Sequence, residues 1–198
     1  SYKQALAIKP DYFGAHNNIG NIFLELGQLD EAVDHFEWAV AYKPDFAEAH
    51  NNLGNALLNI GRLDDAVKSY EKTLTLKPDY TEAHNNLGIA FLKLDQLDIA
   101  VKSFEKAITI KPDYDKAHSN LGNAFKELGQ LDMAAKNYEK AIAINPDYAE
   151  AHNNLGVIFK ELGQLDDAVK SYKKALAINP DYAVAHNNLD IALEELSS

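Results

Sequence analysis

Cysteine is absent from the 198-residue sequence. Disulfides and thiolate metal sites are therefore excluded, although either an oxidising or a reducing compartment remains compatible. Long apolar runs are also missing, because none approaches the ~20 residues that a membrane-spanning helix needs. Proline and glycine number six and ten, too few for a collagen-like or low-complexity chain. We expect a folded protein without membrane insertion, and we place it in the cytoplasm.

Basic residues are in the minority, with 19 Lys and Arg against 30 Asp and Glu and a net charge of −11. Binding to a nucleic acid requires Lys and Arg side chains that displace the counterions condensed on the phosphate backbone. We therefore expect no nucleic acid partner.

The sequence does contain one segment written many times. The run Ala-His-Asn-Asn-Leu-Gly at 151–156 recurs nearly unchanged in steps of 34 residues, starting from Ala15, Ala49, Ala83, Ala117 and Ala185. Such a fixed period is the signature of a repeat protein. We predict a single array over 1–198: a closing half-repeat at 1–12, full repeats at 13–46, 47–80, 81–114, 115–148 and 149–182, and an opening half-repeat at 183–198. Because the chain starts part-way through a repeat, we expect it to be a piece of a longer protein.

Each repeat contains two stretches with the apolar spacing of an α-helix. In the repeat 149–182 these are Ala151, Leu155, Ile158, Phe159 and Leu162, and then Ala168, Val169, Tyr172, Ala175 and Leu176. A glycine row from Gly20 to Gly156 allows close helix approach, and an aromatic row from Phe36 to Tyr172 fills the remaining space. The pattern predicts a helical hairpin in each repeat.

The helix ends carry their own signals. Gly163 is expected to end the first helix, since glycine adopts the left-handed conformation without a steric penalty, and Pro180 stops the second. Asp147 with Glu150 is expected to cap the first helix, and Asp166 the second.

These residues resemble the tetratricopeptide repeat family, a 34-residue helix-turn-helix unit with Leu and Gly in its first helix and a closing Pro. The resemblance covers the whole chain, with departures such as Asp95 for the turn glycine and Asp190 for the helix glycine. It implies an all-α fold, a right-handed α-α superhelix (solenoid) of hairpins. It also implies that the first helices line a concave groove for a protein or an extended peptide.

A row of asparagines, which we call the Asn ladder, lies on that expected face. Asparagine is roughly 0.5 kcal/mol worse than Ala inside a helix, whereas its amide matches the donor and acceptor of an extended backbone. A similar ladder occurs in the O-linked N-acetylglucosamine transferases, which the Asn-Leu-Gly runs resemble. The alternative is that the amides bond to neighbouring repeats or to water. The ladder is Asn18, Asn52, Asn86, Asn120, Asn154 and Asn188, and Asn21, Asn55 and Asn123 follow one turn later.

Other residues along the groove suggest the chemistry of its ligand. Lys126 and Lys160 would meet an acidic segment, whereas Leu24, Leu58 and Leu92 would meet an apolar one. By helical spacing, Asn153 is also expected on the exposed side.

The histidines and Trp38 are the remaining candidate functional residues, and neither indicates catalysis or metal binding. The six histidines in register, from His16 to His186, lie one helix spacing apart, too far to share a zinc ion. We interpret them as packing or capping residues and expect no metal, no cofactor and no catalytic residue. Trp38 stands where later repeats have Lys, so it should face outward, either as a contact residue or as an ordinary surface aromatic.

We therefore predict a protein interaction module and not an enzyme. One alternative is the substrate-recognition arm of a larger, glycosyltransferase-like enzyme. Another is a self-assembling spacer, in which the two terminal half-repeats of different molecules associate head to tail. In that contact Leu189, Ala192, Leu193 and Leu196 would accept Tyr2, Leu6 and Ile8 of the next molecule.

Overall fold

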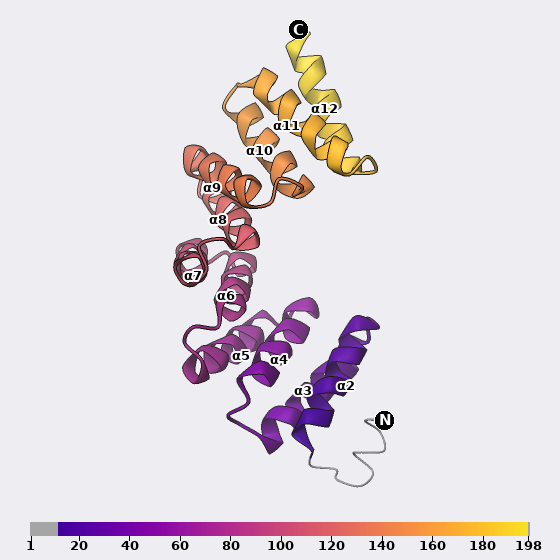
Figure 1. The fold of residues 1–198 in the computed structure, drawn as a ribbon, viewed down its shortest axis with the longest axis vertical. Coiled ribbons are helices and arrows are strands. Elements are labelled where there is room, and N and C mark those ends of the chain that lie inside the picture. Colours follow the sequence, from indigo (N-terminus) through magenta and orange to yellow (C-terminus); the bar gives the residue numbers. More distant parts are fainter. Residues whose placement is uncertain (1–11, 198) are drawn as a thin grey trace. The chain divides into compact units, whose positions relative to one another are not determined.

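The computed structural model describes residues 12–197 and is entirely helical in its regular structure over that range (Figure 1). None of these helices is both long and apolar enough to cross a membrane. The predicted half-repeat at 1–12 lies, apart from Tyr12, outside the described residues. The helices are α2 (Phe13–Glu25), α3 (Leu29–Tyr42), α4 (Ala47–Asn59), α5 (Leu63–Leu76), α6 (Thr81–Lys93), α7 (Leu97–Ile110), α8 (Asp115–Glu127), α9 (Leu131–Ile144), α10 (Ala149–Glu161), α11 (Leu165–Ile178) and α12 (Ala183–Leu196).

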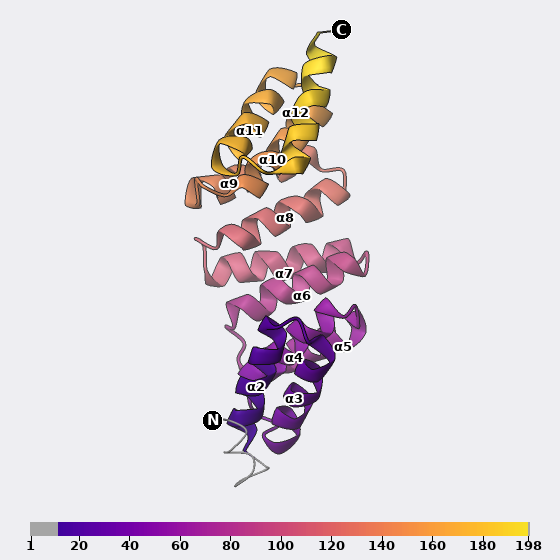
Figure 2. The ribbon, with the colours of Figure 1, turned by 90° about the vertical axis from the view of Figure 1, so that its right-hand side faces the viewer.

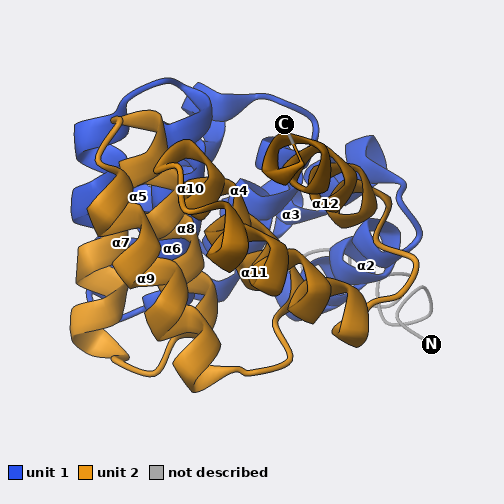
Figure 3. Ribbon diagram, turned by 90° about the horizontal axis from the view of Figure 1, so that it is seen from above, with its two compact units in different colours: residues 1–103 blue, residues 104–198 orange. Residues whose placement is uncertain are grey.

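Consecutive helices pack as antiparallel hairpins, α2 with α3, α4 with α5, α8 with α9 and α10 with α11 (Figure 2). The chain forms two compact units, residues 1–103 and 104–198, and the division falls within α7 (Figure 3). Within each unit the first helices of neighbouring repeats touch, α2 with α4, α4 with α6 and α10 with α12. The predicted all-α class and its stacked hairpins are confirmed, whereas the right-handed superhelical sense stays a prediction.

The predicted glycine at the end of the first helix is confirmed. Gly163 has φ +73°, and its N–H donates to the Lys160 carbonyl at 3.0 Å. The next N–H, of Gln164, reaches back to the Phe159 carbonyl at 2.8 Å. These two bonds form a Schellman motif, which satisfies carbonyls that the helix end leaves open. In the third repeat Asp95 takes the same left-handed conformation at φ +59°.

The predicted N-caps are wrong. The N-cap of α10 is Tyr148, without a side-chain hydrogen bond, and the N-cap of α11 is Gln164. Asp147 instead lies in the turn that follows Pro146, and Asp166 lies in the first turn of α11. The first turns still hold acidic residues, Glu150 in α10 and Asp166 in α11, which interact favourably with the helix dipole.

In the hairpins α2–α3, α4–α5, α8–α9 and α10–α11 an aromatic ring lies against a glycine, as predicted. Tyr70 and Tyr172 are fully buried. A Cβ atom added to Gly54 would lie 2.6 Å from the Tyr70 ring, and one on Gly156 would lie 2.6 Å from the Tyr172 ring. Any larger residue at these glycines would force the ring or the helix to move. Because glycine has no side chain, each ring of the second helix can lie directly against the backbone of the first helix.

The last helix, α12, packs on α11 with part of the face that we expected to be open. Ala192 is fully buried beside Tyr172, and Leu189 packs against the same cluster. Two of the four residues expected to accept another molecule are therefore used within the chain. Leu193 and Leu196 remain 40% and 42% exposed.

Candidate functional site

The Asn ladder lies on the first helices, where all six side chains are partly buried. Four of its six amides, those of Asn52, Asn86, Asn154 and Asn188, donate to asparagines of the preceding repeat. Asn52 Nδ2 donates to Asn17 Oδ1 at 3.1 Å, and Asn188 Nδ2 donates to Asn153 Oδ1 at 3.0 Å. The structural alternative weighed above, bonding between repeats, is therefore present. Since an amide carries two N–H groups and two lone pairs, one such bond leaves it capacity for a ligand.

Two other ladder residues select a different partner, the asparagine one turn later in the preceding first helix. Asn86 Nδ2 donates to Asn55 Oδ1 at 2.9 Å, and Asn154 Nδ2 donates to Asn123 Oδ1 at 3.4 Å. The ladder amides thus bond in two ways: Asn52 and Asn188 donate to a buried asparagine of the preceding repeat, whereas Asn86 and Asn154 donate to an asparagine one turn further along the preceding first helix. The second arrangement also includes a tyrosine.

A buried tyrosine hydroxyl accompanies the second arrangement. Tyr70 Oη donates to Asn55 Oδ1 at 2.8 Å, and Tyr138 Oη donates to Asn123 Oδ1 at 2.6 Å. Each hydroxyl fixes an asparagine that then accepts from the next repeat. Burial raises the pKa of both tyrosines, so their hydroxyls stay protonated donors. In the first repeat Phe36 has no hydroxyl, and there Asn52 bonds to Asn17.

The fifth repeat lacks the acceptor for its tyrosine. Val157 occupies the position of Asn55 and Asn123, and the buried Tyr172 hydroxyl has no hydrogen-bond partner among the described residues. Burial, followed by the nearby carboxylates of Glu161 and Glu195, raises the pKa of Tyr172 to about 12. Sequence reasoning assigned the tyrosines only to the core. The signal that it missed is the 15-residue spacing of each Asn–Tyr pair.

The expectation that Asn153 lies on the exposed side is wrong. Asn153 is 3% exposed, and the matching Asn17, Asn51 and Asn85 are also buried. A helical wheel treats a hairpin in isolation, whereas the next repeat covers this row. Asn153 and Asn85 donate to their neighbours in the ladder, at 3.3 and 3.2 Å.

The two groove lysines form surface ion pairs. Lys126 Nζ lies 3.3 Å from Glu127 Oε1, and Lys160 Nζ lies 3.2 Å from Glu195 Oε1 on α12. Exposed pairs of this kind are worth at most about 1 kcal/mol, so an acidic ligand can displace them. Leu24 and Leu58 pack against the core of the first unit, which reduces the apolar surface available there.

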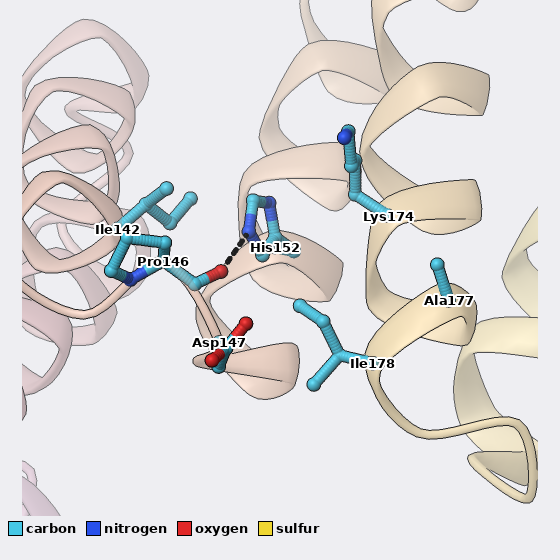
Figure 4. A pocket seen from close by; sticks show the side chains of 7 residues that line it. All are labelled: Ile142, Pro146, Asp147, His152, Lys174, Ala177 and Ile178. Atoms are coloured by element: carbon cyan, nitrogen blue, oxygen red, sulfur yellow. Dashed lines mark hydrogen bonds between the residues drawn. The ribbon is translucent and has the colours of Figure 1, made fainter.

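Five of the six histidines in the row have the structural role that we predicted, whereas His16 Nδ1 lies 3.0 Å from His35 Nδ1. The Nε2 atoms of His50, His84, His118, His152 and His186 lie 2.8 to 3.0 Å from the carbonyl of the proline six residues earlier. Figure 4 shows this bond from His152 to Pro146. Each ring thereby holds the turn between repeats. No group of three potential metal-ligating side chains gathers among residues 12–197.

Two clefts of the second unit lie on the side of the second helices. A cleft of about 680 Å³ is bordered by Ile142, Pro146, Asp147, His152, Lys174, Ala177 and Ile178 (Figure 4). Another cleft of about 430 Å³ is lined by residues of α7 and α9 and by His118 of α8. Neither cleft includes a residue of the Asn ladder. The ladder therefore lies apart from both clefts.

Comparisons with known proteins agree with this architecture. A family model described as TPR repeat matches residues 1–27, 90–129 and 122–163. Models described as tetratricopeptide repeat match 17–81 and 149–182. No curated protein sequence matches the chain.

Three solved structures illustrate the likeness. MamA is 30% identical with a TM-score of 0.74, covering 83% of this chain and 96% of MamA. TTC0263, a thermophilic TPR protein from Thermus thermophilus, is 24% identical with a TM-score of 0.76, covering 91% and 98%. YrrB, a TPR protein with an unusual peptide-binding site, is 21% identical with a TM-score of 0.71, covering 94% and 96%. The last two likenesses show the fold alone.

Proposed function

Because the chain belongs to the tetratricopeptide repeat family, we propose that it is a protein interaction module whose Asn ladder binds an extended peptide of a partner protein. The observation that carries the proposal is the repetition of one partly buried amide on each first helix, four of them held in place by hydrogen bonds between repeats. Fixing a side chain before binding lowers the entropic cost of ordering it in the complex.

The spacing of the ladder fits an extended chain. Packed helices lie roughly 8–10 Å apart, and an extended peptide rises about 3.3 Å per residue. Within each unit, successive ladder amides would therefore meet about every third residue of the peptide. Amides that pair with a backbone select an extended conformation and not a particular side chain, as in the transferase ladder that the sequence resembles.

The proposed contact residues combine the ladder, the asparagines one turn later and the two lysines. The lysines would favour an acidic residue in the peptide, because a ligand carboxylate can replace Glu127 or Glu195 at Lys126 or Lys160. The full set is Asn18, Asn21, Asn52, Asn55, Asn86, Asn120, Asn123, Asn154, Asn188, Lys126 and Lys160. YrrB is itself described by its peptide-binding site, but at 21% identity the proposal depends on the residues of this chain. We also propose a cytoplasmic location and a role in binding instead of catalysis.

The test begins with a displayed library of unstructured peptides, from which a binder is selected. Its affinity is then measured by calorimetry for the chain and for a variant with Asn86, Asn120 and Asn154 changed to Ala. At about 1 kcal/mol for each lost amide contact, we expect affinity to fall roughly a hundredfold. A control changes Asn137 to Ala, since this asparagine lies on the second helix α9 and outside the ladder. Equal affinity of the triple variant and the control would refute the proposal.

A self-assembling spacer remains the second candidate, and the exposure of Leu193 and Leu196 on α12 favours it. One helix face buries less than the ~1,200 Å² of a standard interface, so this association would be weak. Sedimentation equilibrium at increasing concentration tests it, with Leu193→Glu as the disrupting variant. A mass that stays monomeric at every concentration would exclude this candidate.

A further inference from the structure

One face of α3 distinguishes the repeat at 13–46 from its four successors. Trp38 stands where the later repeats have Lys72, Lys106, Lys140 and Lys174, and Asp34 stands where they have Lys68, Lys102, Lys136 and Lys170. Tyr42 replaces an aliphatic residue at the same face. The four later repeats therefore provide the comparison. Where each of them has two lysines, the first repeat has an aromatic ring and a carboxylate.

The aromatic rings on this face form an ordered stack. Trp38 lies over Tyr42 with ring centroids 5.6 Å apart and planes 22° apart. The buried His16 ring lies 6.0 Å from the Trp38 centroid, at 22°. Trp38 nevertheless remains 52% exposed and Tyr42 42% exposed. The rings are therefore held in a fixed orientation while much of their surface stays open to a ligand.

Carboxylates border the exposed Trp38 ring. A cleft of about 310 Å³ is lined by Asp34, Glu37, Trp38 and Ala41. Among residues 12–197, neither carboxylate forms an ion pair. Arg62 interacts electrostatically with Glu37, but its guanidinium is bound to Asp65 at 2.8 Å.

The net charge of the whole repeat also favours a cationic ligand. Residues 13–46 contain six acidic side chains and one Lys, a net charge of −5. Such a field attracts cations and repels phosphates and acidic peptides. The occupant of the cleft should therefore be cationic and should also present a flat surface to the rings.

We propose that Trp38, Tyr42, Asp34 and Glu37 form a binding site for the guanidinium of an arginine in a basic segment of a partner protein. A guanidinium stacks on an aromatic face and at the same time donates to carboxylates, and it is more weakly hydrated than an ammonium. The site lies on a second helix, apart from the Asn ladder, so it does not depend on the proposed peptide groove. A single side chain of this kind binds weakly, with a Kd in the millimolar range.

Trp38 is the only tryptophan in the chain, so its fluorescence reports on this site directly. The probe is the peptide acetyl-Gly-Arg-Gly-amide, titrated at constant ionic strength. Its control is the peptide with citrulline in place of arginine, which has nearly the same shape but no charge. We expect a saturable change in Trp38 emission with the arginine peptide and none with the citrulline peptide. An equal response to both peptides, or no response to either, would overturn the proposal.

Charge reversal then locates the site. In the variant D34K/E37K, which introduces a Lys at each of the two acidic positions, affinity for the arginine peptide should fall at least tenfold. The matched control E105K/E139K makes the same change in net charge at the positions equivalent to Glu37 in two later repeats, and it should bind normally. Retained affinity in the first variant, or an equal loss in both, would overturn the proposal.

A final arm tests whether the chain itself occupies the site. The variant K3Q/K9Q removes the two lysines that precede the described residues. Unchanged Trp38 emission without peptide, and unchanged affinity for the arginine peptide, support an external ligand. A shift in emission like that caused by the arginine peptide would assign the site to the N-terminal segment of this chain and overturn the proposal.

Discussion

The unpartnered hydroxyl of Tyr172 leads to an unusual expectation, namely that Tyr172→Phe stabilises the protein. The hydroxyl is buried and has no hydrogen-bond partner among the described residues, and a buried polar group in that state costs about 1–3 kcal/mol. The variant keeps the ring against Gly156, and Phe36 shows that phenylalanine fits this position in the first repeat. We expect the free energy of unfolding to rise by about 1 kcal/mol.

Tyr138→Phe makes the same chemical change at a tyrosine whose hydroxyl is hydrogen-bonded, so we expect it to destabilise the protein. It removes the 2.6 Å hydrogen bond to Asn123 Oδ1, which is worth about 0.5–1.5 kcal/mol. Asn123 still accepts from Asn154, so its carbonyl keeps a partner and the loss stays in that range. The two substitutions are chemically identical, yet their effects should differ in sign.

Urea unfolding followed by far-UV circular dichroism measures both variants. The slope of free energy against urea must stay equal across them, because repeat arrays lose two-state behaviour when their units uncouple. Val157→Asn restores the missing acceptor, so a double-mutant cycle with Tyr172→Phe should give a coupling energy of about 1 kcal/mol. Destabilisation by Tyr172→Phe equal to that of Tyr138→Phe would refute the assignment of an unsatisfied hydroxyl.

Three further predictions concern local strain and charge. Asp95→Gly should stabilise the chain by about 1 kcal/mol in thermal unfolding, since Asp95 occupies the left-handed region at φ +59°; destabilisation would contradict this. Gly54→Ala should cost about 1–3 kcal/mol in urea unfolding, because its Cβ would lie 2.6 Å from the Tyr70 ring; a neutral effect would show that the ring can move away. Burial first, and the neighbouring His16 second, lower the pKa of His35 below 6.5. The folded state then binds fewer protons than the unfolded state, so stability should fall as pH decreases from about 7 to 5, and by less in His35→Gln; equal slopes would contradict this.

Much of the fold follows from periodicity in the sequence. The helical spacing, the glycine at Gly163 and the proline at Pro180 place the helices, because each depends on interactions within a few residues. The capping prediction fails for a local reason as well. Tyr148 N–H donates to the Asn145 carbonyl at 3.2 Å, so the turn around Asp147 closes before α10 begins.

The candidate site was less accessible to sequence reasoning because it depends on neighbouring repeats. Asn153 is polar and lies on the side of the helix away from its own hairpin, yet the following repeat buries it and Asn188 bonds to it. The choice of partner by each ladder amide depends on a hydroxyl that arrives from the second helix, as at Tyr70 and Asn55. Residue spacing records both members of that pair but not the rotamers that bring them together.

Side-chain amide signals of asparagine provide the most direct test of the central claim, that the ladder is the peptide-binding surface. A chain labelled with nitrogen-15 at asparagine would be titrated with the library-selected peptide and followed by two-dimensional NMR. We expect the Nδ2 signals of Asn52, Asn86 and Asn154 to shift saturably with one dissociation constant, while that of Asn137 on the second-helix side stays fixed. A shift of the signal of Asn137, which borders a second-helix cleft, with the ladder signals unchanged, would contradict the account.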